Sequence, residues 1–124
     1  MLTSYNVNRE IKFYKTASGK CPVKEFIDAQ PGKVAQKITW VLRLIETQEK
    51  VPIIYFKNLI GTKIYECRIE FGGNIYRILG QFYQEHFILL TNGFQKKTQK
   101  IPKEEIRLCI KRMADQIERG IKYE

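Results

Sequence analysis

The chain has 124 residues, of which 44% are hydrophobic and 28% charged, so we expect one soluble globular domain spanning residues 1–124. Its 22 Lys and Arg residues outnumber 13 Asp and Glu residues, and the net charge of +9 favours nucleic acid or an acidic protein as a partner. No apolar run is long enough to span a bilayer and no signal-peptide pattern opens the sequence, so we expect a cytoplasmic protein that binds no membrane.

The cysteines and the single histidine argue against a metal centre. Cys21, Cys67 and Cys109 lie far apart and form no C-x-x-C motif, which is typical of buried or half-buried thiols in a reducing compartment. His86 falls at an expected turn, where it is poorly placed for a Ser-His-Asp triad. We therefore expect neither a metal site nor another cofactor.

The first half of the chain predicts one short strand followed by two helices. Residues 10–15 (EIKFYK) alternate apolar and polar side chains, as a strand does. Pro22 suits the first position of a helix over 22–30, which a Pro-Gly pair at 31–32 ends. A longer helix over 32–47 follows, and its apolar stripe comprises Val34, Ile38, Val41, Leu42 and Ile45.

The second half predicts a meander of strands and a final helix. In the irregular segment 49–61, Pro52 argues against a central strand over 51–56, and 57–61 are expected to form a loop. Residues 63–98 show the densest alternation and predict three consecutive antiparallel strands. Pro102 opens a helix that ends near Gly120, and the stripe expected to pack in the core comprises Ile106, Cys109, Ile110, Met113 and Ile117.

These elements predict an α+β fold with the order β-α-α-β-β-β-α, built on a twisted antiparallel sheet. For the first strand to join that sheet, the pair of helices must form the crossover. We expect the two N-terminal helices to cover one face of the sheet and the opposite face to stay open.

A two-residue Gly-Gly turn at 72–73 predicts the register of the first hairpin of the meander. Arg68 then lies opposite Arg77 on the polar face, where like charges cost roughly 0.2–1 kcal/mol. Two explanations are open. Either Glu66 and Glu70 neutralise the pair locally, or the two guanidinium groups are held together to bind an anion such as phosphate.

A basic loop after the last predicted strand favours the anion. The loop spans residues 93–98 (GFQKKT) and carries Lys96 and Lys97, and Lys100 and Lys103 follow. It should lie at an end of the sheet that carries the arginine pair. Basic groups that converge from two strands and a loop are what a nucleic-acid backbone requires.

Two strings in this region resemble a known family. YECRIEFGGNIYRIL (65–79) and LTNGFQKKTQK (90–100) are similar to motifs of the RelE/HigB-like toxins of bacterial type II toxin–antitoxin systems, in particular their phage-derived branch, and 22–27 and 102–106 extend the resemblance. It implies a RelE-like fold with two N-terminal helices on one face of the sheet and a C-terminal helix. It also implies a ribosome-dependent endoribonuclease that cleaves mRNA without a metal, by attack of a ribose 2′-OH on the adjacent phosphodiester.

The resemblance assigns roles by position. The implied catalytic residues are Arg68, Arg77 and one of Lys96 and Lys97; the implied RNA-contacting residues are Lys57, Glu66, Asn92, Thr98 and Lys100. The chain departs from the family pattern where Glu66 replaces a basic residue and Asn92 replaces a frequent histidine. Glu66 serves either as the base or as the partner of Arg77, and the proton acceptor is not identified.

The resemblance also implies partners: the ribosome and mRNA, and an inhibiting antitoxin with a helix-turn-helix domain like HigA. Operator DNA is a further expected partner of the toxin–antitoxin complex. Two alternatives keep the fold and change the function: a ParE-like toxin that binds DNA gyrase, and a non-catalytic nucleic-acid-binding module derived from a phage.

Overall fold

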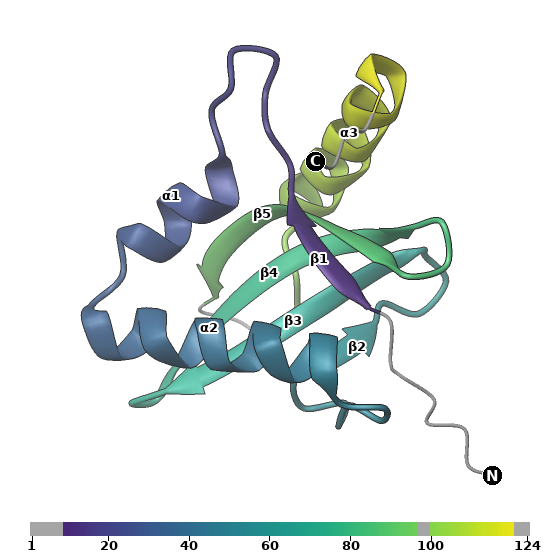
Figure 1. Ribbon diagram of the computed structural model, residues 1–124. Coiled ribbons are helices and arrows are strands. Elements are labelled where there is room, and N and C mark those ends of the chain that lie inside the picture. The colour runs from purple at the N-terminus through teal and green to yellow at the C-terminus, as the bar shows by residue number, and fades with distance from the viewer. Residues whose placement is uncertain (1–8, 97–99, 121–124) are drawn as a thin grey trace, which may run out of the picture.

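The structure is a computed structural model that describes residues 9–96 and 100–120 (Figure 1). It is an α+β fold with three helices and one five-stranded sheet. The elements in chain order are β1 (Glu10–Phe13), α1 (Pro22–Asp28), α2 (Gly32–Thr47), β2 (Phe56–Asn58), β3 (Ile64–Phe71), β4 (Asn74–Tyr83), β5 (Phe87–Lys96) and α3 (Lys103–Arg119). None of the helices in these ranges is long and apolar enough to cross a membrane.

The sheet has the strand order β1-β5-β4-β3-β2 and is mixed rather than antiparallel throughout. Strands β2 to β5 pair antiparallel with their neighbours, as the predicted meander requires, but β1 pairs parallel with β5. The helices α1 and α2 therefore carry the chain from one edge of the sheet to the other, and the expected crossover is confirmed.

Strand β2 corrects the prediction of a loop over 57–61. The Pro52 carbonyl accepts hydrogen bonds from the N–H groups of Tyr55 (2.9 Å) and Phe56 (3.2 Å), so the proline opens a turn that leads into the strand. A three-residue edge strand has too little alternation to stand out in a sequence. Because β2 is an edge strand, it does not conflict with the argument from Pro52 against a central strand.

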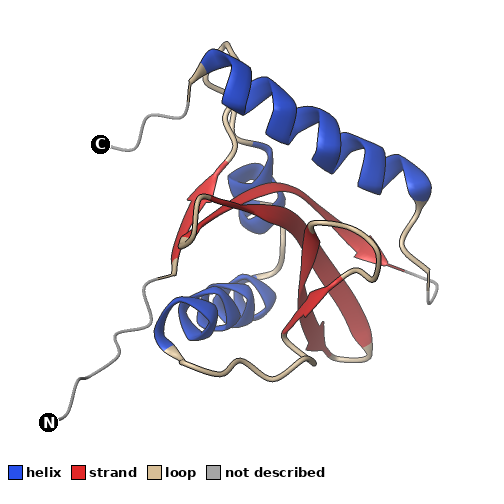
Figure 2. Cartoon of the chain, turned by 90° about the vertical axis from the view of Figure 1, so that its right-hand side faces the viewer, coloured by secondary structure: helices blue, strands red, loops and turns tan. Residues whose placement is uncertain are grey.

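Helices α1 and α2 pack on one face of the sheet (Figure 2). The predicted stripe of α2 is buried in the core, and Ile38, Val41 and Ile45 are fully buried. The N-terminal end of the described chain reinforces this packing, because Arg9 Nε donates to the Ile45 carbonyl at 2.8 Å near the end of α2. Carbonyl groups in the last turn of a helix lack intrahelical partners, so this contact stabilises the helix end.

Helix α3 covers part of the second face, which corrects the expectation that the whole of this face is open. Cys109 and Met113 are buried against it, but Ile110 and Ile117 are 53% and 55% exposed, which corrects their predicted place in the core. Around the helix axis these two lie about 80–100° from Cys109, beyond the arc that faces the sheet. A helix that packs on a sheet buries only one narrow face. The predicted apolar stripe is wider than this face, so it includes residues that lie in solvent.

Hydrogen bonds tie α3 to the first strand and to β5. The Tyr14 hydroxyl, just after β1, donates to the Asp115 carboxylate at 2.6 Å, and Arg119 donates to the same group at 2.9 Å. Arg112 donates to the Thr91 carbonyl at 2.8 Å. The hydrogen bonds from Arg119 and Tyr14 lower the pKa of Asp115. The charged form of this carboxylate therefore helps to hold α3 in place.

We expect the contribution of Asp115 to depend on pH. The pKa of an unfolded Asp is about 4, so a carboxylate with a lower folded pKa adds stability above that value and loses it as the pH falls through the folded pKa. Asp115→Asn should lower the Tm at neutral pH, and the gap to the wild type should shrink as the pH falls from about 5 to about 2. Thermal unfolding followed by circular dichroism measures both, and a gap that does not change with pH would contradict the role of the charge.

Candidate functional site

The β3–β4 hairpin has the predicted register, with Arg68 opposite Arg77. Its turn glycines have φ values of 59° and 81°, which glycine adopts without strain and which match the twist of a tight hairpin. Strand β2 adds Lys57 opposite Glu66. Because partners across a sheet point to the same face, Lys57, Glu66, Arg68 and Arg77 share the face on which α3 also lies.

A buried ion pair lies at the centre of this group. Arg77 Nη1 donates to the carboxylate of Glu66, and each residue is only 4% exposed. Glu66 therefore offsets the repulsion between Arg68 and Arg77. The Arg77 Nε is also buried, and it has no hydrogen-bond partner among the residues that the structure describes.

A pocket of about 570 Å³ opens beside this pair, at the β3 side of the sheet. Four cationic and two acidic side chains line it, which leaves an excess of two positive charges: Lys37, Lys57, Arg68 and Arg77 against Glu66 and Glu70. Such an excess at a concave surface suits a phosphate group. Lys37 reaches the pocket from α2, where its Nζ donates to the Glu70 carbonyl.

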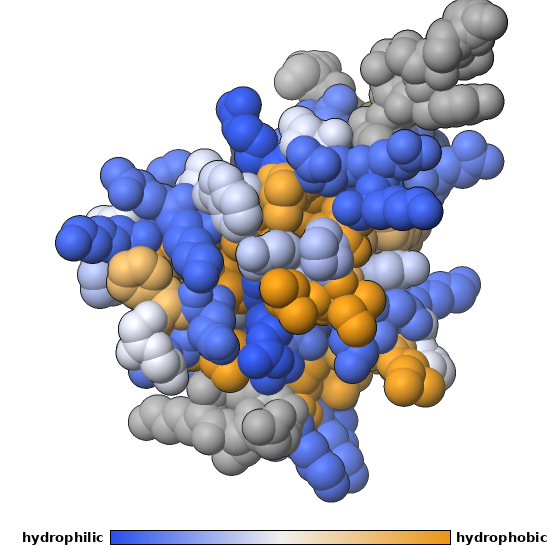
Figure 3. Space-filling view, turned by 90° about the horizontal axis from the view of Figure 1, so that it is seen from below, coloured by the Kyte–Doolittle hydropathy of each residue, from blue (hydrophilic) through white to orange (hydrophobic). Residues whose placement is uncertain are grey.

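The outer wall of the pocket is apolar. Ile53 and Ile54 line it and are 71% and 61% exposed, and Tyr55 lies beside them. Figure 3 views the molecule from the side of α2 and the segment that follows it, where apolar side chains gather among hydrophilic ones. The pocket thus combines a cationic floor with an apolar wall, a pairing that fits the phosphate and the base of a nucleotide.

The structure brings together only part of the predicted site. Lys57, Glu66, Arg68 and Arg77 line the same pocket. Asn92 lies instead beneath α3, is 2% exposed, and donates through its amide to the Glu105 side chain at 2.9 Å. Asn92 therefore connects β5 to α3 through this hydrogen bond.

The predicted residues of the basic loop lie near the limit of the described chain. The prediction of a loop over 93–98 was wrong for 93–96, because β4 is long enough to pair with these residues and β5 runs on to Lys96, whose backbone lies opposite Ile75. Lys97 and Thr98 fall outside the described residues. Lys100 is exposed in the connection to α3.

Sequence reasoning missed Lys37, Glu70 as a lining residue, and the wall of Ile53 to Tyr55. Lys37 has no distinctive sequence signal, since it is one of several lysines off the apolar stripe of α2. The irregular apolar segment 51–56 was a usable signal. The segment contains two adjacent isoleucines and no polar residue. Because it does not form a central strand, the core cannot cover all of these side chains, and some of them are exposed.

The buried ion pair can be tested by stability. Glu66→Leu leaves the Arg77 guanidinium buried without its partner, so we expect it to cost roughly 3–5 kcal/mol of unfolding free energy. The double variant Glu66→Leu with Arg77→Met removes both charges and should recover most of that loss. Urea denaturation measures each value, and equal stability of Glu66→Leu and the wild type would contradict the pair.

Comparison with known proteins places the chain in a family. No curated protein matches it significantly. The sequence model of a family described as phage derived protein Gp49-like (DUF891) matches residues 25–114. The match runs from α1 into α3, so it includes strands β2 to β5 and the basic pocket. Since it covers well over half of the chain, this protein belongs to the Gp49-like family of phage-derived proteins, within the RelE/ParE toxin-like superfamily.

Proposed function

We propose that this protein is the toxin of a type II toxin–antitoxin system, with a RelE-like fold of the HigB type, and that it cleaves mRNA on the ribosome. Membership of the Gp49-like family supports the role of a toxin. The observation that carries the nuclease activity is the pocket in which Arg68, Lys57 and the buried Arg77 converge.

In this proposal, the pocket binds the scissile phosphate. Arg68 is half-buried and Lys57 exposed, so both are free to meet a ligand from solvent. Arg77 lines the same pocket and is bound by Glu66, so we propose that its fixed positive charge acts on the phosphate from the inner wall. Fixed donors in a partly desolvated site stabilise the negative charge that develops on the phosphate in the transition state.

The proposed reaction is an internal transesterification. The ribose 2′-OH loses its proton to a base, its oxygen attacks phosphorus, and the bond from phosphorus to the 5′-oxygen breaks. The leaving oxygen takes up a proton, so the products are a 2′,3′-cyclic phosphate and a 5′-OH end. Glu66 is engaged by Arg77, and we therefore assign the proton acceptor to the exposed carboxylate of Glu70 in the same pocket.

The remaining predicted residues take supporting roles in this proposal. Lys96 ends β5 and Lys100 lies in the connection to α3. We propose that these two residues, together with Lys97 and Thr98, contact the RNA backbone beyond the scissile phosphate. Because Asn92 is buried against Glu105, we assign it to holding α3 on β5 rather than to contacting RNA. An antitoxin with a helix-turn-helix domain, the ribosome, mRNA and, for the complex, operator DNA are the proposed partners.

A second candidate is a ParE-like toxin that acts by binding DNA gyrase. The exposed apolar side chains of Trp40, Ile53 and Ile54 favour it, since they are 51%, 71% and 61% exposed and such groups mark protein-binding surfaces. The excess of cations in the adjacent pocket favours the nuclease instead.

Cleavage of mRNA on programmed ribosomes tests the proposal. Arg68→Ala removes a half-exposed cation at little structural cost, so we expect cleavage to fall by roughly 10²- to 10³-fold with an unchanged Tm. The matched control is Lys63→Ala, which removes an exposed cation outside the pocket and should cleave like the wild type. Intact mRNA after incubation with the wild-type protein would contradict the nuclease.

The two candidate functions differ in what they stop first in a cell. For the nuclease, expression should halt incorporation of labelled amino acids before any DNA-damage response appears, and Arg68→Ala should abolish the arrest. Induction of a DNA-damage reporter while translation continues would instead identify the gyrase-directed toxin.

A further inference from the structure

Lys37 is a cation of the basic pocket that the proposed reaction leaves without a role. It lies on α2, whereas the other cations of the pocket come from the strands β2, β3 and β4. It is half-buried, and its Nζ donates to the carbonyl of Glu70, which lies beyond the stretch of β3 that β2 covers. The pocket is therefore lined by a helix as well as by the sheet.

The contact with Glu70 does not neutralise the charge of Lys37. A carbonyl group carries no net charge, and an ammonium group has three hydrogen-bond donors, of which this contact uses one. Among the residues that the structure describes, no carboxylate forms an ion pair with Lys37. Lys37 can therefore hold the edge of β3 with one donor and offer its charge and its other donors to a ligand.

The charges and the size of the pocket suit more than a single phosphate. The buried ion pair contributes no net charge, so three cations and one carboxylate set the balance: Lys37, Lys57, Arg68 and Glu70. The volume of about 570 Å³ lies within the range of roughly 300–1,000 Å³ that is usual for pockets of small organic ligands. The pocket therefore has room for a nucleotide unit beside the scissile phosphate.

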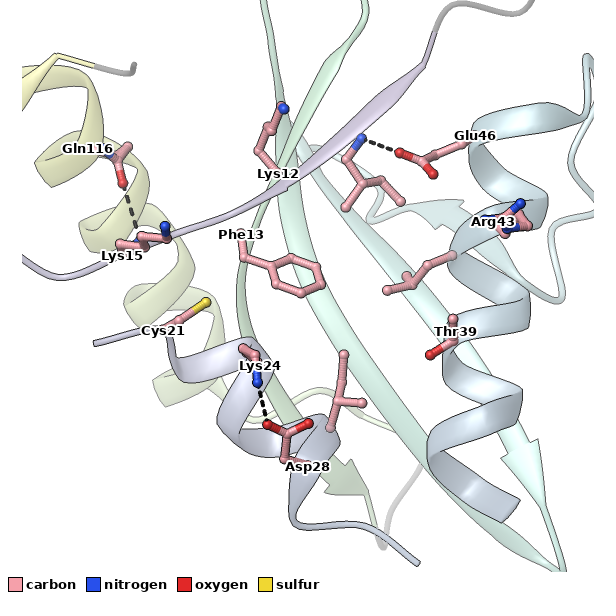
Figure 4. A pocket seen from close by; sticks show the side chains of 13 residues that line it. Lys12, Phe13, Lys15, Cys21, Lys24, Asp28, Thr39, Arg43, Glu46 and Gln116 are labelled. Atoms are coloured by element: carbon pink, nitrogen blue, oxygen red, sulfur yellow. Dashed lines mark hydrogen bonds and ion pairs between the residues drawn. The ribbon is translucent and has the colours of Figure 1, made fainter. Parts of the chain in front are cut away.

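A second cavity of the chain differs in its charges. It is a groove of about 700 Å³ along β1, between this strand and the helices α1 and α2 (Figure 4). Two of its lysines are paired within the chain: Lys24 with Asp28 at 2.7 Å and Lys12 with Glu10 at 3.1 Å. These pairs reduce the positive charge that the groove offers to an anion, whereas Lys37 keeps its charge in the basic pocket.

An exposed aromatic ring lies next to Lys37 on α2. Trp40 follows Lys37 by three residues, so the two side chains are neighbours on the helix surface. Trp40 is 51% exposed, and its ring meets the ring of Tyr55, which lines the pocket, edge to face with 5.6 Å between the centroids. Proteins that bind single-stranded nucleic acid combine cations that follow the backbone with aromatic rings on which bases stack.

We propose that α2 forms a second part of the RNA site, in which Lys37 binds the phosphate next to the scissile one and Trp40 stacks on an adjacent base. The identity of the substrate rests on the proposed nuclease, whereas the choice of residues rests on the pocket and on α2. The Tyr55 carbonyl accepts a hydrogen bond from the Arg68 N–H at 2.9 Å. This bond ties the ring that supports Trp40 to the strand that carries Arg68, so the two parts of the site keep a fixed spacing.

An uncleavable strand separates binding from cleavage. A fluorescein-labelled 2′-O-methyl oligoribonucleotide lacks the attacking hydroxyl, and fluorescence anisotropy gives its affinity for the full chain over a series of salt concentrations. Each phosphate that a cation neutralises contributes about 0.7 to the slope of log affinity against log salt concentration. Lys37→Met should therefore lower the magnitude of this slope by about 0.7, and Lys37→Arg, which keeps the charge, should have the slope of the wild type.

Lys33 provides the matched control. It is exposed one turn before Lys37 on α2 and lies outside the pocket, so Lys33→Met should leave the slope unchanged. If Lys37 only holds the Glu70 carbonyl, Lys37→Met will lower the Tm and leave the slope unchanged, which would overturn the proposal. Equal losses of slope in both variants would overturn it too, because they would show a non-specific attraction to α2, and so would a wild-type chain that does not bind the strand at low salt.

Trp40 is the only tryptophan of the chain, so tryptophan fluorescence reports on stacking at this residue. The oligoribonucleotide should quench this fluorescence, whereas tripolyphosphate, which has the charge but no base, should not. Trp40→Ala should weaken binding of the strand roughly 5- to 100-fold. Unchanged fluorescence at saturation would overturn the proposal. So would a Trp40→Ala variant that binds RNA normally but no longer arrests growth, since that result identifies a protein-binding surface.

Cleavage of mRNA on programmed ribosomes is measured with the same preparations. Intact mRNA together with a reduced slope in Lys37→Met would reject the nuclease and support the RNA site on α2. Cleaved mRNA together with an unchanged slope would reject the site on α2 alone. Failure of the nuclease and failure of this site are therefore distinguishable.

Discussion

The buried ion pair between Glu66 and Arg77 is the interaction on which the polar side of the sheet depends. Two arginines opposite each other on neighbouring strands repel, and burial of one of them adds a desolvation cost. The carboxylate of Glu66 offsets both effects, because it binds Arg77 directly and lies on the same face. Arg77 is thereby fixed in position, while Arg68 remains accessible beside it.

This pair also explains how one face of a sheet serves both packing and binding. Toward β5 and β1, the face is apolar and covered by α3, which Tyr14 and Arg112 hold in place. Toward β2 and β3, the same face carries charges and opens into the basic pocket. The ion pair lies next to the covered part, where a lone guanidinium would be too costly to bury.

Much of the fold followed from local chemistry. The Gly-Gly turn determines a two-residue hairpin, so the pairing of Arg68 with Arg77 could be predicted from spacing alone. Helix α2 runs from Gly32 to Thr47, as predicted. It begins directly after Pro31, and its apolar stripe lies within these bounds. In contrast, the three-residue β2 and the parallel pairing of β1 carry no comparable signal, because both depend on which edge of the sheet is available.

The sequence by itself determined the class of the fold and the register of the central hairpin, which pairs Arg68 with Arg77. Its resemblance to a toxin family singled out Lys57, which lines the same pocket as these two arginines. The sequence left open whether Glu66 or an anion balances the arginine pair, and only tertiary structure decided that Glu66 binds Arg77. Only the tertiary structure also showed that Lys37 reaches the pocket, that Asn92 binds Glu105, and that a groove runs along β1. Their surroundings come from helices far away in the chain, and the docking of a helix on a sheet is decided by packing of the whole core rather than by any local pattern.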